Sequence, residues 1–254
     1  MTEGQPVRPA NILHIIAINQ GREPLTMDEP AAPSLSPREF AELADDGHAV
    51  VDTRSSAAFG SGHIPGAYNL QLSSPEFEQR VGWVVPLELL ILLVADDAAA
   101  ARRAQHKMAF VGLDQRVEGV LAGGMAAWIG AGMAHATLSQ LSVHELQGRL
   151  QNGAKLQGGG GLQNGATIRA LDVREAAEWN DGHIEGAASM SFKILADHLD
   201  EIGIAPEDPV AVLCAGGIRS SAACSILLRN GYKRVHNVTG GMGAWNAANL
   251  PTVT

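Results

Sequence analysis

The chain of 254 residues contains the same pattern twice, and this repeat constrains its fold more than any other feature. The stretch 50–67 matches the stretch 170–187 at a constant spacing of 120 positions. The matched positions are Asp52 with Asp172, Arg54 with Arg174, His63 with His183 and Gly66 with Gly186. A repeat of this length predicts two copies of one domain, each within the usual size of a folding unit. We expect a leader at 1–30, a first domain at 31–134 and a second domain at 137–254.

The two copies also match at their beginnings and ends. Each begins with a serine followed three residues later by a glutamate, at Ser36 and Ser142, which is the capping-box signature of a helix start. Each ends with G-G-M-x-A-W, at 123–128 and 240–245. Between these points, helical stretches alternate with short strand-like runs, which include 48–51, 168–171 and 210–213. This alternation predicts α/β domains built around a mostly parallel sheet.

One stretch of the second copy joins a strand, a thiol and a helix. The apolar run 210–213 leads into Cys214, and the residues that follow are Ala215, Gly216, Gly217, Ile218, Arg219 and Ser220. A thiol at the carboxyl edge of a buried strand faces the start of the next helix, whose N–H groups stabilise a thiolate and bind an anion beside it. Glycines allow the backbone amides to form a cradle, and Arg219 adds donors at its rim. We predict Cys214 as a nucleophile with 215–220 as its binding loop; the other interpretation is a small buried thiol.

The first copy lacks these groups. Alignment of the copies places Ala95 opposite Cys214 and Ala100 opposite Arg219, and the glycines of the loop are missing. Two carboxylates, Asp96 and Asp97, stand where an anion is expected in the second copy. The first copy is therefore predicted to be an inactive scaffold or docking partner.

Composition excludes several classes of partner. The net charge is −9 and the basic residues form no stripe, which argues against nucleic acid or an anionic membrane surface. The longest apolar run, 87–95, contains a glutamate and is too short to cross a bilayer. The first residues show neither the charged nor the apolar region of a signal peptide. With only Cys214 and a second, core-like Cys224, we expect no disulfide framework, and a working thiol favours a reducing cytoplasm.

Three motifs in order resemble those of the rhodanese (sulfurtransferase) superfamily, from about Ala31 to the C-terminus. They are D-V-R-E-x-x-E-W-x-x-G-H-I-x-G-A, C-A-G-G-I-R-S and G-G-M-x-A-W. The resemblance implies two tandem rhodanese-like domains, each a mainly parallel five-stranded sheet with helices on both faces. It also implies an inactive first copy followed by a catalytic second copy.

The same resemblance implies transfer of sulfane sulfur through a persulfide on Cys214. The donor is thiosulfate or a low-molecular-weight persulfide, the acceptor is a thiol, sulfite or cyanide, and neither a metal nor an organic cofactor takes part. The leader Arg8–Leu25 resembles the closing helix of metallo-β-lactamase-fold persulfide dioxygenases, which implies a dioxygenase as a fusion partner. The alternatives are a relic of such a fusion or an ordinary amphipathic leader helix.

Several supporting residues are predicted around the loop. Asp172 and Arg174 are expected to form an ion pair that supports the loop from beneath. His183 recurs in the copy without a cysteine, which favours a structural role. Trp179 borders the mouth of the site or packs in the core, and the Gly-rich insertion 154–167 is expected to be a flexible surface loop.

Two other functions stay open. Related phosphatases and arsenate reductases use a cysteine–arginine loop whose arginine lies one residue further from the cysteine. Arg219 follows Cys214 at five residues, and the smaller loop favours attack on sulfur. The second alternative is a docking or regulatory module without turnover, for which Cys214 would be dispensable.

Overall fold

The structure is a computed structural model that describes residues 7–26, 30–156 and 167–254. The chain divides into two compact units, Met1–Thr137 (unit 1) and Leu138–Thr254 (unit 2). Most of the predicted Gly-rich insertion, at 157–166, lies outside the described residues. Within the described part of the chain, no helix is both long and apolar enough to cross a membrane.

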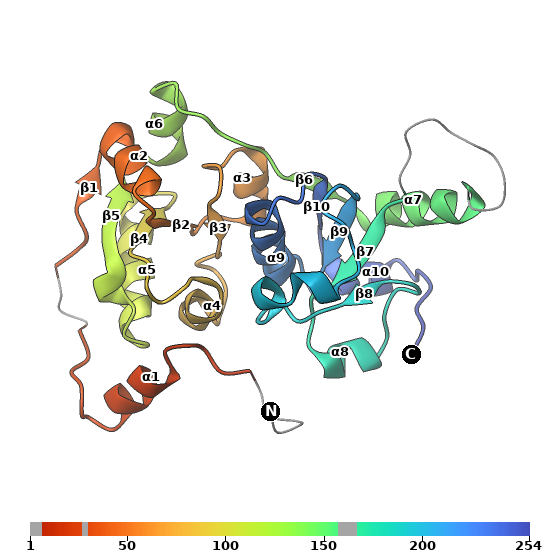
Figure 1. The fold of residues 1–254 in the computed structure, drawn as a ribbon, viewed down its shortest axis with the longest axis horizontal. Coiled ribbons are helices and arrows are strands. Elements are labelled where there is room, and N and C mark those ends of the chain that lie inside the picture. Colours follow the sequence, from red (N-terminus) through yellow and green to blue (C-terminus); the bar gives the residue numbers. More distant parts are fainter. Residues whose placement is uncertain (1–6, 27–29, 157–166) are drawn as a thin grey trace. The chain divides into compact units, whose positions relative to one another are not determined.

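Unit 1 is built around one sheet of five parallel strands, in the order β1-β5-β4-β2-β3 (Figure 1). Its strands are β1 Ser34–Leu35, β2 Ala49–Asp52, β3 Tyr68–Asn69, β4 Ile91–Val94 and β5 Val117–Leu121. Its helices are α1 Ile12–Asn19, α2 Pro37–Asp45, α3 Ser56–Ser61, α4 Phe77–Val84, α5 Ala98–Ala109, the 3-10 turn η1 Asp114–Arg116 and α6 Gly124–Gly130.

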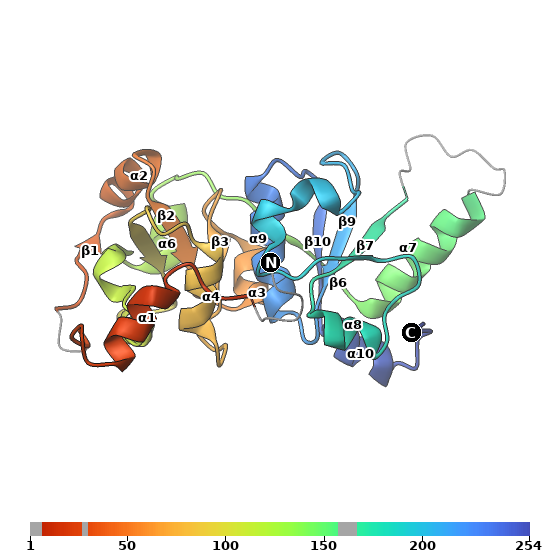
Figure 2. The same cartoon turned by 60° about the horizontal axis from the view of Figure 1, so that its bottom comes forward.

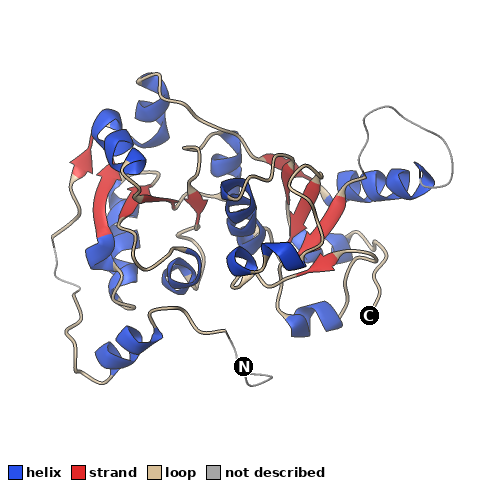
Figure 3. Ribbon diagram, viewed as in Figure 1, coloured by secondary structure: helices blue, strands red, loops and turns tan. Residues whose placement is uncertain are grey.

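Unit 2 repeats this topology, with five parallel strands in the order β6-β10-β9-β7-β8 (Figure 1). Figure 3 distinguishes the helices and strands of both units by colour. Its strands are β6 Ser139–Leu141, β7 Arg169–Asp172, β8 Ala188–Ser189, β9 Val210–Leu213 and β10 Val235–Val238. Its helices are α7 Val143–Leu156, α8 Ala176–Asn180, the 3-10 turns η2 Leu195–Asp197 and η3 Leu199–Glu201, α9 Ile218–Arg229 and α10 Gly241–Ala247. The predicted tandem α/β fold is therefore confirmed, and the first strand of each unit, β1 or β6, is a short one that the sequence pattern did not reveal.

Helices cover both faces of the sheet in unit 2 (Figure 2). On one face, side chains of α7 and α10, among them Leu146 and Trp245, pack with Ala170, Leu213 and Val238 of the strands. Successive residues of a strand point to opposite faces of the sheet. The strand residues that do not face α7 and α10 therefore point to the other face, which α9 covers. The face that α9 covers therefore also receives the residue that follows Leu213, which is Cys214.

The predicted capping boxes begin the first main helix of each unit. In unit 1 the Ser36 Oγ accepts the N–H of Glu39 at 3.4 Å, and the Glu39 carboxylate accepts the N–H of Ser36 at 2.9 Å. In unit 2 the Ser142 Oγ and Glu145 form the same reciprocal pair. These contacts satisfy amide groups that have no partner within the helix.

The repeated G-H-I turn closes each unit on its own C-terminal segment. His63 pairs with Ala136 and His183 pairs with Val253, each through two backbone hydrogen bonds of 2.9 Å. The rings stack on the preceding aromatic side chain, His63 on Phe59 and His183 on Trp179. Both histidines therefore have a structural place in the turn, and the half-buried Trp179 packs on one of them.

We expect the stability of unit 1 to fall in mild acid because of His63. Burial lowers the pKa of this imidazole below its usual 6.5, against the opposing effect of the hydrogen bond to the Phe59 carbonyl. The unfolded chain therefore binds the proton more tightly than the folded one, so stability is complete above about pH 6.5 and is lost as the pH falls below it. Thermal unfolding of the wild type and of His63→Gln at neutral and mildly acid pH tests this. An equal loss of stability in both proteins would contradict it.

The leader packs on unit 1. The Asn11 side-chain amide donates to the Val111 carbonyl at 2.6 Å, and the Ala10 N–H donates to the Gly82 carbonyl at 3.3 Å. Gly112 is required beside α1, because a Cβ built there would lie 1.9 Å from the His14 ring. The leader is therefore part of the same compact unit as the first repeat.

Candidate active site

Cys214 follows the last residue of β9, at the carboxyl edge of the sheet in unit 2. Its relative exposure is 1%, whereas Ala215 and Gly216 directly after it are exposed. The sulfur thus lies beneath the predicted binding loop and not on the open edge of the strand.

The start of α9 faces the sulfur. The Gly217 N–H donates to the Cys214 Sγ at 3.1 Å, and Gly217 is the N-cap of α9 with a φ of 97°. This left-handed conformation favours glycine and turns the amide toward the thiol. Of the predicted cradle of amides at 215–220, this is the one whose hydrogen bond to the sulfur is present. An N–H and the positive end of a helix dipole at the sulfur are the features expected to stabilise a thiolate.

The backbone that carries Cys214 is fixed from the other side by the start of α10. The N–H groups of Met242 and Gly243 donate to the carbonyls of Cys214 and Ala215 at 2.7 and 2.9 Å. Gly241 allows this close approach, because a Cβ built there would lie 2.1 Å from the Cys214 carbonyl oxygen. The G-G-M motif therefore seats the cysteine, a role that its position in the sequence did not disclose.

Arg219 forms a bidentate ion pair with Glu178 of α8. Its two terminal nitrogens lie 2.6 and 2.7 Å from the two carboxylate oxygens. This pairing raises the pKa of Arg219 and lowers the pKa of Glu178, against the opposing effect of burial in both. The Cys214 sulfur is close enough to raise the pKa of Arg219 as well. The predicted donor at the rim is therefore already engaged by a carboxylate that sequence reasoning did not identify.

Asp172 and Arg174 form the ion pair expected from the sequence, with Arg174 Nη2 and Asp172 Oδ2 2.7 Å apart. Both residues are buried, and the same guanidinium nitrogen donates to the Gly182 carbonyl at 2.8 Å. Unit 1 repeats the arrangement with Arg54, Asp52 and the Gly62 carbonyl. The pair joins the end of a central strand to the G-H-I turn in both units.

Removal of the carboxylate from this pair is expected to destabilise its own unit. Asp172→Ala leaves a buried guanidinium without its counter-charge, which costs about 3–5 kcal/mol in the free energy of unfolding. Asp52→Ala is the matched variant and should cost unit 1 a similar amount. Urea unfolding followed by circular dichroism measures both. Loss of sulfur transfer in Asp172→Ala with an unchanged unfolding midpoint would instead assign the pair to the chemistry.

Unit 1 carries an acidic cap where unit 2 carries its cysteine loop. Ala95 occupies the position after β4, and α5 begins three residues after it, whereas α9 begins four residues after Cys214 in unit 2. The Asp97 side chain caps α5 by accepting the Ala100 N–H at 2.6 Å. The positive end of this helix is therefore already bound to a carboxylate, which agrees with the predicted lack of chemistry in this copy.

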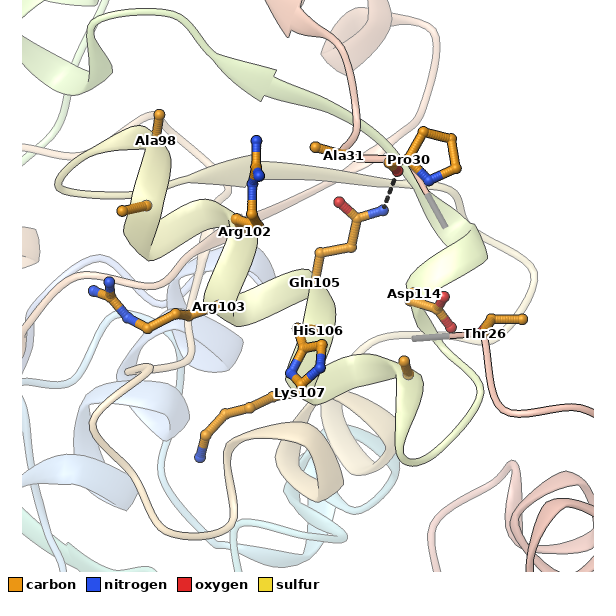
Figure 4. A pocket seen from close by; sticks show the side chains of 12 residues that line it. Thr26, Pro30, Ala31, Ala98, Arg102, Arg103, Gln105, His106, Lys107 and Asp114 are labelled. Carbon is orange, nitrogen blue, oxygen red and sulfur yellow. Dashed lines mark hydrogen bonds between the residues drawn. The ribbon is translucent and has the colours of Figure 1, made fainter. Parts of the chain in front are cut away.

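A groove of about 970 Å³ lies in unit 1 along α5 (Figure 4). Its lining includes the cationic side chains of Arg102, Arg103 and Lys107, together with His106 and Asp114. The side-chain amide of Gln105, on α5, donates a hydrogen bond to the carbonyl of Pro30, which lies in the segment before β1. The groove is lined by residues of unit 1 alone and includes no cysteine, so it is not the predicted site.

Unit 2 is a parallel α/β fold in which the thiol of Cys214 lies between the end of a strand and the start of a helix. These features place the protein in the class of α/β proteins with a cysteine-containing loop. The sequence model of the rhodanese-like domain family matches residues 36–131 and 155–248 of the chain. The chain therefore belongs to the rhodanese-like domain family and contains two copies of that domain.

Three relatives illustrate the similarity, and each of them matches one part of the chain. The thiosulfate sulfurtransferase GlpE of Shewanella oneidensis is 31% identical over 83 residues, which is 33% of this chain and 80% of that protein. A sulfurtransferase of Allochromatium vinosum is 37% identical over 87 residues, covering 34% and 78%. The solved rhodanese-like domain of Anabaena Alr3790 is 32% identical, with a TM-score of 0.38, and covers 45% of this chain and 77% of that one. Both curated relatives named here are called sulfurtransferases.

Proposed function

We propose that the protein is a sulfurtransferase that carries sulfane sulfur as a persulfide on Cys214. The observation that carries the proposal is the Gly217 N–H, at the start of α9, directed at the Cys214 sulfur at 3.1 Å. Curated relatives named as sulfurtransferases support the same reaction class. Thiosulfate or a low-molecular-weight persulfide is the donor, and no metal or organic cofactor is required. The dioxygenase partner and the cytoplasmic location stay predictions.

The reaction consists of two displacements at sulfur. The Cys214 thiolate attacks the outer sulfur of the donor, a new S–S bond forms, and the donor's own sulfur–sulfur bond breaks. Sulfite leaves with its electron pair when thiosulfate is the donor, and a thiolate leaves when an organic persulfide is the donor. A thiol, sulfite or cyanide then attacks the terminal sulfur and regenerates the Cys214 thiolate. The Gly217 N–H and the start of α9 stabilise negative charge on the sulfur in both steps.

The spacing between Cys214 and Arg219 supports this reaction over the phosphatase alternative, because the arginine follows the cysteine at five residues and the smaller loop favours attack on sulfur. Both oxygens of Glu178 already bind the Arg219 guanidinium, which leaves less positive charge for a phosphate or a thiosulfate dianion alike. The docking alternative does not account for a cysteine held between two helix starts.

Intact-mass measurement tests the proposal. The wild type is treated with thiosulfate, with glutathione persulfide or with p-nitrophenyl phosphate. We expect a gain of one sulfur atom with a sulfur donor, its loss on addition of cyanide or thiol, and no release of p-nitrophenol. Phosphatase activity without sulfur loading would establish the alternative enzyme class. Inert protein that still binds a partner would establish the docking module.

A further inference from the structure

A chain of buried polar side chains leads away from the Cys214 sulfur into the sheet. The Cys214 thiol donates to the Ser220 Oγ at 3.5 Å, and the Ser220 hydroxyl donates to the Asn237 Oδ1 at 2.6 Å. The Asn237 side-chain N–H donates to the Gln140 Oε1 at 2.8 Å. Ser220 and Asn237 are both fully buried. We name Ser220, Asn237 and Gln140 the sulfur relay.

The direction of every hydrogen bond in the sulfur relay is fixed at its far end. The Gln140 side-chain N–H donates to the Leu138 carbonyl at 3.2 Å, and a carbonyl oxygen can only accept. The other end of the Gln140 amide is therefore an acceptor, which turns the N–H of Asn237 toward it and the Oδ1 of Asn237 toward Ser220. The single hydroxyl proton of Ser220 is then committed to Asn237, so Ser220 presents a lone pair to the sulfur.

Unit 1 has none of these groups in the matching places. The pairing of Gln140 with Asn237 across β6 and β10 corresponds to the pairing of Ser34 with Val120 across β1 and β5. Ala101 lies at the position of Ser220, six residues after Ala95, as Ser220 lies six after Cys214. The same sheet is therefore stable with Ala and Val at the positions that correspond to Ser220 and Asn237. Asn237 is bonded at both ends, so its burial is compensated, and the bonded set occurs at these places only in the unit that carries the cysteine.

We propose that Asn237 and Gln140 are positioning residues that restrain the reactivity of Cys214 by setting the direction of the Ser220 hydroxyl. The inference rests on the proposed function of Cys214 as the nucleophile. A thiol can donate to the lone pair that Ser220 presents, whereas a thiolate can only accept and meets that lone pair unfavourably. Conversion to the thiolate requires the Ser220 hydroxyl to rotate toward the sulfur, which leaves the buried Asn237 Oδ1 without its donor. The sulfur relay thus favours the neutral thiol, while the Gly217 N–H favours the anion.

Three other ionisable groups act on the sulfur, directly or through a partner, and are unchanged by variation in the sulfur relay. Arg219 and Cys224 both lie within electrostatic range of Cys214. Glu178 acts on the sulfur through its pairing with Arg219. A change in the reactivity of Cys214 that follows substitution of Asn237 or Gln140 alone is therefore due to the sulfur relay and not to these ionisable groups.

Three variants test the inference, because they are expected to change the reactivity of Cys214 in different directions. Asn237→Val, which introduces the residue found at the matching place in unit 1, frees the Ser220 hydroxyl to donate to the thiolate. Gln140→Leu removes the anchor and lets the Asn237 amide turn its N–H to Ser220, with the same consequence. Asn237→Asp binds the hydroxyl more tightly and opposes the thiolate. Thiolate ultraviolet absorbance and the rate of alkylation by iodoacetamide, in which the thiolate displaces iodide, are measured near neutral pH.

We expect both readouts to rise about three- to tenfold in Asn237→Val and by less in Gln140→Leu, and to fall in Asn237→Asp. Asn69→Val, at a fully buried strand asparagine of unit 1, is the matched control and should leave both readouts unchanged. A role in packing alone would move reactivity in the same direction in all three variants. Any order other than two variants above the wild type and one below it overturns the inference. Because no sulfur donor is present, this failure is distinct from a failure of Cys214 to load sulfur.

Discussion

Serine in place of Cys214 is expected to reduce sulfur transfer to background, a loss of at least about a thousandfold. The hydroxyl replaces the thiol at nearly the same volume and can accept the Gly217 N–H, so the fold of unit 2 should survive. A serine oxygen is not ionised at neutral pH and forms no persulfide. Cyanide-dependent formation of thiocyanate from thiosulfate measures the rate, and intact mass should show no added sulfur.

Cys224→Ala is the matched control for this variant. Cys224 is fully buried in α9, and burial raises the pKa of its thiol well above the usual value. It therefore stays protonated near neutral pH, and its removal should leave sulfur transfer within about twofold of the wild type. A sulfur atom that still loads onto Cys214→Ser but not onto Cys224→Ala would move the nucleophile to Cys224 and end the proposal.

A methyl group at Gly241 is expected to cause the second largest loss. In Gly241→Ala the new Cβ would lie 2.1 Å from the Cys214 carbonyl oxygen, and the residue has a φ of 50°. The contact must push the cysteine backbone away from α10 and disturb the hydrogen bond from the Met242 N–H. We expect unit 2 to lose about 3 kcal/mol of stability and sulfur transfer to fall about a hundredfold, because a displacement of about 1 Å at a reacting group has this effect.

Unit 1 supplies a matched control for Gly241→Ala. Gly124 has the same left-handed conformation, with a φ of 56°, and a Cβ there would lie 3.0 Å from the Ala95 carbonyl oxygen. Gly124→Ala should therefore cost unit 1 about 1–2 kcal/mol without reducing sulfur transfer. Urea unfolding and thiocyanate formation are measured on both variants. Equal rates of sulfur transfer in both would show that α10 does not seat the cysteine.

The repeat made much of the fold predictable. Capping boxes, apolar strands and the G-H-I turn can be predicted locally, because the residues that form each of them lie within a few positions of one another in the sequence. The short first strand of each unit escaped prediction because two or three residues carry no periodicity. For the candidate site, the sequence predicted Cys214 and its loop, because glycine at Gly217 serves a left-handed N-cap that few other residues adopt. It also identified the copy that lacks the cysteine, through Ala95 opposite Cys214.

The sequence alone therefore determined that two α/β units are present, that one carries a thiol at a helix start, and that Asp172 and Arg174 have counterparts in both. The partners of that thiol were decided only by the tertiary structure. Glu178 lies 41 residues from Arg219, and Gln140 lies 97 residues from Asn237, so no local spacing relates them. These side chains meet because a parallel sheet places strands distant in sequence side by side, and the order of those strands is a property of the whole fold.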